Sequence, residues 1–288
     1  MEGHRFDALA KMLAAGSSRR RLIGRIGRLG GAVVALAGTA ATGVKGLRGA
    51  AAQEEFSIDH FKCYDVSPSE EFTPIDVELK DQFTSGRVRV GPPDTLCNPV
   101  GKNGAEIRDP ASHLTCYPIE ELDPSALPPE VVVDNQFGSL TLKIGKTQRL
   151  CVPSRKKEPP DGDGCDVKGD HYTCYTAKPA EGEVEVLPFE LKDQFGATQV
   201  RIRDPRVVCT PTDKNGEGIA DRELHYDCRQ IVASSPDFQP RKVTIENQLG
   251  TFTFAVEKPD VLCAPSCKSL EGRCDAIPNA NHYQCYAG

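Results

Sequence analysis

The sequence predicts an all-β protein made of tandem repeats of a small antiparallel unit, four units in two domains, held together by disulfides. Three observations support this prediction. A His-x-x-Cys-Tyr element recurs along the chain, the residues between its copies alternate between apolar and polar, and all twelve cysteines lie after residue 53. We divide the chain into a leader, residues 1–52, and two β-repeat domains, residues 53–165 and 166–288.

The leader has the features of an export signal. Arg19 and Arg20 stand in a Ser-Arg-Arg-Arg-Leu-Ile sequence, an apolar Gly/Ala-rich stretch follows at residues 30–44, and small residues at 50–52 provide a cleavage site. This arrangement resembles a bacterial twin-arginine signal peptide. The apolar stretch is shorter than the ~20 residues that span a bilayer, and its glycines weaken a helix. We therefore expect twin-arginine export to the periplasm or the cell exterior, removal of the leader, and no membrane span afterwards.

The rest of the chain is acidic. Nine of the 35 Lys/Arg but only Glu2 and Asp7 of the 41 Asp/Glu belong to the leader, which leaves 26 basic and 39 acidic residues in 53–288. A surface with that balance repels polyanions, which argues against nucleic acid as a partner.

Three short elements repeat in a fixed order. The His-x-x-Cys element occurs five times, with its histidines at His60, His113, His171, His225 and His282. Between them lie an Asp/Asn-Gln-Phe/Leu element, at Asp81, Asn135, Asp193 and Asn247, and a Leu/Val-Cys-x-Pro element, at Cys97, Cys151, Cys209 and Cys263. Because 111 residues separate His60 from His171 and again His171 from His282, the chain contains two copies of a two-unit block. Such repetition is typical of one supersecondary unit stacked several times.

The residues around the second element indicate a β-hairpin in every unit. Val77 and Leu79 alternate with Glu78 and Lys80 before it, and a period of two also follows it. A glycine stands near each joint, at Gly86, Gly138, Gly196 and Gly250. Period-two alternation around a glycine predicts paired strands with one buried face.

Twelve cysteines in an exported chain indicate a disulfide framework. A turn joins each Leu-Cys-x-Pro strand to the next His-x-x-Cys strand, so we expect bridges between neighbouring units. The expected pairs are Cys97–Cys116, Cys151–Cys174, Cys209–Cys228 and Cys263–Cys285, with Cys267–Cys274 and Cys63–Cys165 completing the set. The alternative scheme pairs cysteines within units, beginning with Cys63–Cys97, and sequence does not decide between the two.

The repeated histidines raise the question of a metal site. Residues three apart on a strand point to opposite faces, so Cys63 faces inward with Phe61 while His60 lies with Lys62 and Tyr64. One strand therefore cannot offer both side chains to one ion. We interpret the histidines and tyrosines as a polar, aromatic stripe that bonds neighbouring backbone.

The aspartates of the second element have a structural interpretation as well. Asp81 and Asp193 occur in alternate units, and Asn135 and Asn247 replace them in the others, so a charge is not required there. Short Asx side chains satisfy backbone N–H groups at turns. We expect Asx caps at these four positions rather than catalytic carboxylates.

An acidic loop is the candidate calcium site. Asp161, Asp163 and Asp166 stand in an Asp-Gly-Asp-Gly-Cys-Asp sequence and are the candidate ligands. Cys165 occupies the fifth position, where an EF-hand carries Asp or Asn, and no flanking helices are predicted. A solvated acidic turn is the simpler interpretation.

The chain contains no nucleophile-elbow, zinc-protease, phosphate-loop or dinucleotide motif. We therefore expect a non-enzymatic protein without a cofactor, an extracellular binding or cell-surface interaction module for an unknown ligand. The alternative is an exported protein that binds calcium or a transition metal, and a hydrolase with dispersed residues has the least support.

The repeated His-x-x-Cys-Tyr, Asp-Gln-Phe-Gly and Leu-Cys-x-Pro elements resemble an uncharacterised family of cysteine-rich repeat domains in exported bacterial proteins. The resemblance covers about residues 56–288 and implies export and a repeat fold, but no activity. Two positions depart from the pattern, because Arg229 replaces the tyrosine and Leu249 replaces the phenylalanine.

Overall fold

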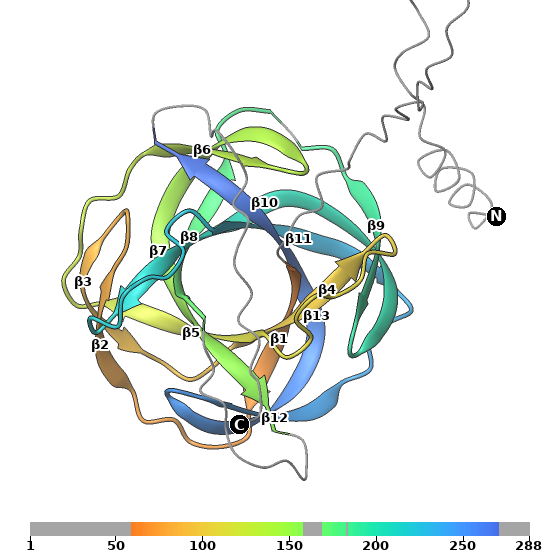
Figure 1. Ribbon diagram of the computed structural model, residues 1–288, viewed down its shortest axis with the longest axis horizontal. Coiled ribbons are helices and arrows are strands. Elements are labelled where there is room, and N and C mark those ends of the chain that lie inside the picture. The colour runs from red at the N-terminus through yellow and green to blue at the C-terminus, as the bar shows by residue number, and fades with distance from the viewer. Residues whose placement is uncertain (1–58, 158–168, 183, 271–288) are drawn as a thin grey trace, which may run out of the picture. The chain divides into compact units, whose positions relative to one another are not determined.

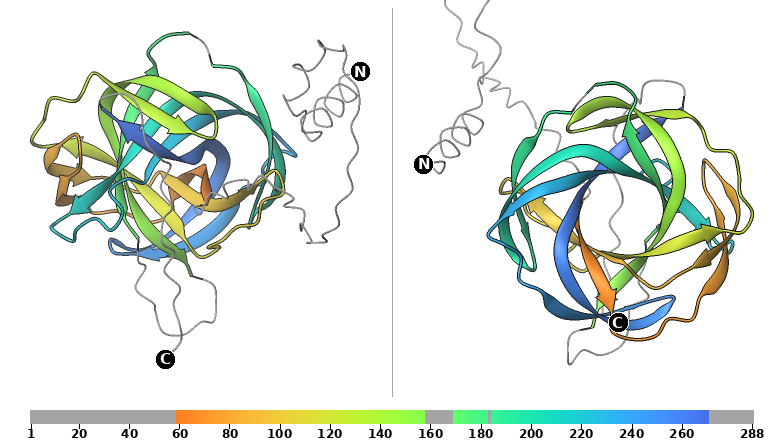
Figure 2. Two further views of the ribbon diagram at one scale, coloured as in Figure 1. Left: turned by 45° about the horizontal axis from the view of Figure 1, so that its top comes forward. Right: turned by 180° about the vertical axis from the view of Figure 1, so that it is seen from behind.

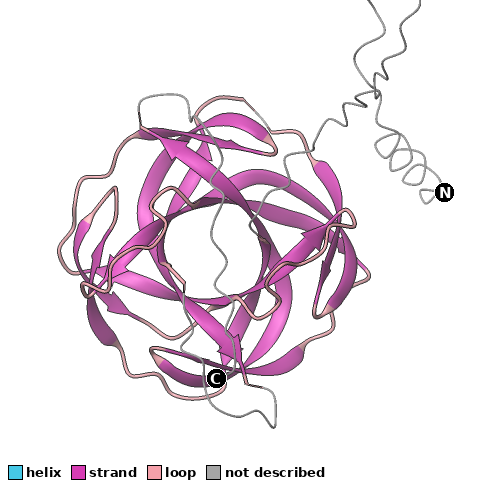
Figure 3. Ribbon diagram, in the orientation of Figure 1, coloured by secondary structure: helices cyan, strands magenta, loops and turns pink. Residues whose placement is uncertain are grey.

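The computed structural model describes residues 59–157, 169–182 and 184–270 (Figure 1). All regular structure in these ranges is antiparallel β, with thirteen strands and no helix (Figure 3), which confirms the predicted fold class. The strands are β1 (His60–Pro68), β2 (Ile75–Lys80), β3 (Ser85–Val90), β4 (Thr95–Lys102), β5 (His113–Glu121), β6 (Glu130–Asn135), β7 (Gly138–Lys156), β8 (His171–Pro179), β9 (Leu187–Asp193), β10 (Gly196–Lys214), β11 (His225–Ser235), β12 (Arg241–Asn247) and β13 (Gly250–Ser269). The described residues contain no helix long and apolar enough to cross a membrane.

Each predicted repeat is one unit of the fold. Unit 1 comprises β1–β4, unit 2 β5–β7, unit 3 β8–β10 and unit 4 β11–β13. A unit starts with the His-x-x-Cys strand, forms a hairpin at the Asp/Asn-Gln element, and returns through the Cys-x-Pro strand. In units 2, 3 and 4 the returning arm of the hairpin continues into the Cys-x-Pro strand. In unit 1 these parts are separate strands, β3 and β4, because Pro92 and Pro93 lie between them and cannot donate to a ladder.

Eight strands close into a ring. In cyclic order β1, β4, β5, β7, β8, β10, β11 and β13 each pair with the next, and β13 pairs with β1. Figure 1 shows this ring end-on. Ring closure leaves no unpaired edge among these eight strands.

One compact unit, Ala52–Gly288, therefore stands in place of the two domains expected at 53–165 and 166–288. β7 pairs with β8 across the expected boundary, and β1 pairs with β13 at the other seam. Two separate four-stranded sheets would expose four strand edges, whereas one ring exposes none. The spacing of the repeats predicts the number of units correctly, but it does not predict that the four units pair into one closed ring.

Eight of the cysteines point into the ring. Phe61, Leu114, Tyr172 and Tyr226 pack there with them as one buried cluster. The parity argument from the sequence is therefore confirmed, because Cys63 and Phe61 share the inner face while Tyr64 belongs to a different cluster outside the ring.

The bridges join cysteines within units. They are Cys63–Cys97, Cys116–Cys151, Cys174–Cys209 and Cys228–Cys263. The pairing expected between units is therefore wrong for Cys97–Cys116, Cys151–Cys174, Cys209–Cys228, Cys263–Cys285 and Cys63–Cys165. The reason is strand register. Cys63 lies directly opposite Cys97, whereas across the unit border Cys97 lies opposite Leu114, two residues before Cys116.

The remaining cysteines are only partly described. Cys267 is disulfide-bonded, and its partner lies outside the described residues. Cys165, Cys274 and Cys285 also lie outside them, so the expected Cys267–Cys274 bridge stays a prediction.

The four hairpins cover the outside of the ring (Figure 2). The hairpin of each unit packs its apolar face on the next unit. Val77 and Leu79 of unit 1, for example, pack with Tyr117 and Leu150 of unit 2. The hairpin then pairs with the Cys-x-Pro strand two units along: β2 with β10, β9 with β4, β6 with β13 and β12 with β7. The outer face of the ring is consequently buried, and the side chains on it meet residues distant in sequence.

Candidate functional site

Two of the predicted sites fall outside the described residues. Arg19 and Arg20 of the leader and the candidate calcium ligands Asp161, Asp163 and Asp166 are not described. The histidines and Asx residues of the repeats are described in all four units, together with Tyr64, Tyr117, Tyr175 and Arg229 at the tyrosine position, and they meet on the outer face of the ring.

The Asx residues cap the hairpin turns, as predicted. Asp81 Oδ1 accepts hydrogen bonds from the backbone N–H groups of Phe83 and Thr84, at 2.7 and 2.9 Å. Asn135, Asp193 and Asn247 each accept one from the residue two positions on, at 2.8 to 2.9 Å. Aspartate and asparagine serve equally in this role, because both offer an Oδ1 acceptor.

In units 1 and 3 the second carboxylate oxygen bonds a tyrosine of the unit two places away, on the outer face of the ring. Tyr175 OH and Thr210 Oγ1 donate to Asp81 Oδ2 at 2.6 and 2.8 Å, and Tyr64 OH donates to Asp193 Oδ2 at 2.5 Å. Burial raises the pKa of both tyrosines, and the neighbouring carboxylates raise it further, so both remain donors. The tyrosines therefore bond side chains two units away rather than the neighbouring backbone that the sequence led us to expect.

In units 2 and 4 the same contact uses an amide. Asn247 Nδ2 donates to Tyr117 OH at 2.7 Å, and Asn135 Nδ2 donates to Asp227 Oδ2 at 2.9 Å. Arg229, which replaces the repeat tyrosine, donates from Nε to the same Asp227 oxygen at 2.9 Å. Asp227 is thus the change that compensates for Arg229, and both side chains are buried.

The histidines lie at one end of the ring, and three of the four described ones meet the glutamine of another unit. Gln194 Nε2 is 3.0 Å from His113 Nε2, Gln248 Oε1 is 3.1 Å from His171 Nε2, and Gln136 contacts His60. Each glutamine contacts the preceding unit and follows an Asx cap that bonds the unit two places away. One hairpin tip therefore contacts two other units at once.

A lysine stands beside every one of these histidines, and the sequence interpretation missed it. A Cys-x-Pro-x-x-Lys spacing holds in all four units, at Lys102, Lys156, Lys214 and Lys268. Each lysine lowers the pKa of the histidine in its own unit. The fixed spacing of five residues after the cysteine was the available signal.

Burial controls the charge of these groups. It lowers the pKa of His60 and of His113 to about 3, with the adjacent lysine adding to the effect, so both rings are neutral at neutral pH. Burial also lowers the pKa of Lys102 to about 8 and of Lys268 to about 7.

Three of the four His–Lys junctions have hydrogen-bond partners. Lys102 donates to Gln136, Lys156 Nζ donates to Asn98 Oδ1 at 2.9 Å, and Lys214 forms an ion pair with Glu217. In each of the three the histidine also contacts the glutamine of another unit.

The junction of unit 4 with unit 1 differs. His225 is 1% exposed and Lys268 6% exposed, yet both ring nitrogens of His225 and the Nζ of Lys268 have no hydrogen-bond partner. Lys268 Nζ lies 3.6 Å above the centre of the Phe83 ring. Gln82, the glutamine in the equivalent position, is exposed. Because an unpaired buried polar group costs about 1–3 kcal/mol, this junction is where the described residues could accept a ligand.

Metal ligation has no support in the described ranges. They contain no group of three or more His, Cys, Asp or Glu side chains arranged to hold an ion. On every unit the histidine and the cysteine of one strand lie on opposite sides of the ring wall, as predicted.

Comparisons with known proteins identify the repeat but no activity. No curated protein and no solved structure matches the chain. A family model described as a repeat of unknown function (DUF7450) matches residues 113–219, which contain units 2 and 3. In that segment the chain is thus similar to an uncharacterised repeat family.

Proposed function

We propose that the protein is an exported, non-enzymatic binding module whose ligand site is the junction of unit 4 with unit 1, formed by His225, Lys268 and Phe83. The observation that supports this most directly is the contrast among the four junctions. Three have bonded His and Lys side chains, and the fourth presents three buried, unpaired nitrogen atoms.

The chemistry of the junction selects a carboxylate-bearing ligand. A lysine ammonium and a neutral imidazole N–H are both donors, and both suit an anionic oxygen. Asp81 and Glu223 already act on Lys268 and raise its pKa against the effect of burial. A singly charged carboxylate therefore suits the site better than a phosphate dianion, which the two acidic side chains would repel. The face of the Phe83 ring offers an apolar wall beside it.

The site lies just beneath the surface. Leu270, two residues after Lys268, is 55% exposed, and Gln82 is exposed on the facing turn.

Export outside the cytosol is part of the proposal. Four buried disulfides suit an oxidising compartment, and the leader sequence resembles a twin-arginine signal. Fractionation of the producing cells tests it. The chain should be found outside the cytoplasm without residues 1–52, and replacement of Arg19 and Arg20 by lysine should retain it inside.

Calorimetric titration tests the ligand site. We expect glucuronate to bind the oxidised full chain and its uncharged methyl ester to bind at least tenfold more weakly. Lys268→Met should abolish binding. Lys156→Met is the matched control, because its Nζ is bonded to Asn98 whereas the Nζ of Lys268 has no hydrogen-bond partner. Equal binding of acid and ester, or binding that survives Lys268→Met, would reject the site.

A further inference from the structure

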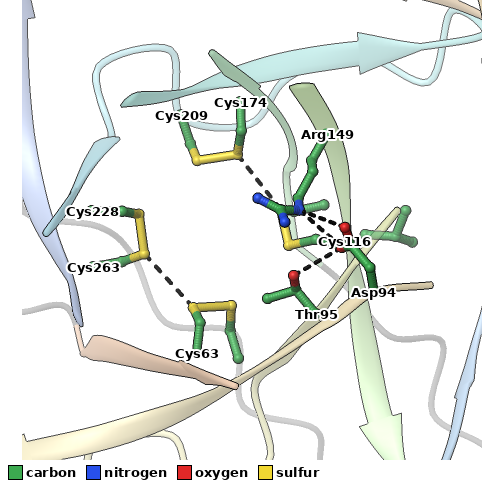
Figure 4. The surroundings of a disulfide bond; sticks show 12 residues. Cys63, Asp94, Thr95, Cys116, Arg149, Cys174, Cys209, Cys228 and Cys263 are labelled. Atoms are coloured by element: carbon green, nitrogen blue, oxygen red, sulfur yellow. Dashed lines mark hydrogen bonds and ion pairs between the residues drawn. A yellow bond between two sulfur atoms is a disulfide. The ribbon is translucent and has the colours of Figure 1, made fainter. Parts of the chain in front are cut away.

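The four disulfides inside the ring form two couples (Figure 4). Sγ of Cys63 lies 3.7 Å from Sγ of Cys263, which brings the Cys63–Cys97 and Cys228–Cys263 bridges into contact. Sγ of Cys151 lies 3.6 Å from Sγ of Cys174 and joins the other two bridges in the same way. Disulfide sulfur carries no proton, so these are van der Waals contacts.

Strand order explains the two couples. The contacts follow the β1–β13 and β7–β8 seams, where unit 4 meets unit 1 and unit 2 meets unit 3. We name the groups cluster A and cluster B. Cluster A is Cys63, Cys97, Cys228 and Cys263, and cluster B is Cys116, Cys151, Cys174 and Cys209.

All eight cysteines are at most 6% exposed and surround a cavity of about 40 Å³. Phe61, Leu114, Tyr172 and Tyr226 complete its lining, together with a few residues at its rim that include Arg149. One water needs about 10–15 Å³ of such space, so the cavity admits a few waters or ions and excludes larger ligands.

We propose that reduction converts each cluster into a tetrahedral four-cysteine site for a thiophilic divalent ion such as Zn²⁺, two ions per chain. A dithiol or phosphine reductant supplies two electrons to each disulfide, and with two protons the bridge becomes two thiols. An ion that binds four thiolates then releases the four thiol protons. This inference concerns the scaffold and does not depend on the proposed ligand site.

The spacing between the bridges fits the coordination geometry. Tetrahedral zinc with Zn–S bonds of about 2.3 Å places its sulfur ligands about 3.8 Å apart. The contacts of 3.6 and 3.7 Å between bridges already approach that separation. Within a bridge the cysteines are directly opposed across paired strands, so rotation about each Cα–Cβ bond separates the sulfurs while the backbone ladder stays paired.

The four thiolates of each reduced cluster determine which metal ion it binds. Soft thiolates select Zn²⁺ and Cu⁺ over Ca²⁺ and Mg²⁺. The His side chains lie on the other side of the ring wall and do not complete either site. A metal-bound ring would keep its units cross-linked before the bridges form, where a reducing compartment disfavours disulfides.

Cobalt titration of the reduced full chain tests the proposal. The chain is reduced anaerobically with a phosphine, and Co²⁺ is followed by the ligand-field and sulfur-to-cobalt charge-transfer bands of tetrahedral cobalt thiolates. We expect two Co²⁺ per chain, displacement of both by Zn²⁺, a mass increase of two zinc ions in native mass spectrometry, and retained β-sheet circular dichroism. The oxidised chain should bind none.

Variants assign the ions to the clusters. Cys63→Ser should bind one ion, Cys116→Ser one, and the double variant none. Cys267→Ser is the matched control, because its bridge belongs to neither cluster, and it should bind two. If Cys63→Ser does not fold when oxidised, Cys228→Ser removes a ligand of the same cluster. Absence of the cobalt bands, a stoichiometry that Cys63→Ser leaves unchanged, or loss of β structure in excess metal would each overturn the proposal.

Discussion

Removal of one interior bridge should destabilise the ring by an amount that is nearly the same for all four. Sequence separations between bridged cysteines are 34, 35, 35 and 35 residues, and the four loops follow one another without overlap. Each bridge therefore restricts its own segment of the unfolded chain, and the effects of removing one bridge from cluster A and one from cluster B should be additive.

The magnitude follows from loop length. For a closed loop of about 35 residues, the chain-entropy relation gives about 3.8 kcal/mol at 25 °C. Replacing both cysteines of a bridge by alanine also removes buried sulfur contacts, which adds to the loss. We therefore expect the Cys63→Ala/Cys97→Ala and Cys174→Ala/Cys209→Ala variants each to lose about 4 kcal/mol of unfolding free energy.

Urea denaturation, followed by circular dichroism and by tyrosine fluorescence, measures both variants. The slope of the transition should also rise, because an uncross-linked loop exposes more surface when it unfolds. A loss below about 1 kcal/mol for either variant, or losses that differ by more than about 2 kcal/mol, would refute the loop-entropy reasoning. So would a double removal whose effect departs from the sum of the two.

Three further predictions follow from the buried polar groups. Unfolding free energy should fall as pH drops from 6.5 towards 3. His60 and His113 have a folded pKa of about 3, so in that pH range they take up protons only after unfolding. Urea midpoints that stay constant between pH 6.5 and 4 would contradict this prediction. Lys268→Met should stabilise the chain below pH 7 and remove the rise in stability that the parent shows between pH 7 and 10.5, because the folded pKa of Lys268 is about 7. Thermal melts of parent and variant that superimpose across this pH range would contradict the prediction. Arg229→Tyr alone should lower the unfolding free energy by about 3–5 kcal/mol, because it leaves Asp227 buried without its cation. Adding Asp227→Thr should recover most of that loss in the same melts, since units 2 and 3 carry Thr and Tyr at these positions. If the double variant recovers nothing, the two residues are not coupled.

Local features were predictable from the sequence because they depend on parity and turn chemistry. Period-two alternation placed Cys63 inside the ring and Tyr64 outside it, and the exchange of Asp for Asn at Asp81 and Asn135 identified the Asx caps. These inferences need only the two-residue repeat of a strand and the donors at a turn.

Relations between units were not predictable in the same way. Parity predicts which face of a strand is buried but not which unit covers it, so the register that places Cys63 opposite Cys97 could not be predicted. One signal was present and unused. Asp and Asn alternate every second unit, and the contacts also join every second unit, since Asp81 meets Tyr175 and Asp193 meets Tyr64.

Contacts between alternate units imply that no unit is complete by itself. Each hairpin lies on the next unit and pairs with the one after it, so two units contain the bridges but not the partners of their own hairpins. In residues 113–219, Asn135 and Asp193 lack their partners of the full chain. A second copy of that segment would replace them. Asn135 could donate to Tyr117 of the copy as Asn247 does, and Asp193 could accept from Tyr175 of the copy as Asp81 does.

We therefore expect residues 113–219, with Cys165→Ser to remove the odd thiol, to form a twofold homodimer that closes the ring from two copies. Ring closure pairs every strand edge with a neighbouring strand, whereas a monomer would leave the edges of β5 and β10 unpaired. Light scattering coupled to size-exclusion chromatography gives the mass, and Asp193→Leu should drive the sample to unfolded monomer by removing the acceptor for the partner's Tyr175. Asp170→Ala, which removes a carboxylate that bonds only loop backbone at Ala220 and Asp221, outside the segment, is the matched control and should leave the dimer intact. A folded monomer of 113–219 would show that a two-unit block is self-sufficient, and the dependence of each hairpin on a unit two places away would then be incidental to folding.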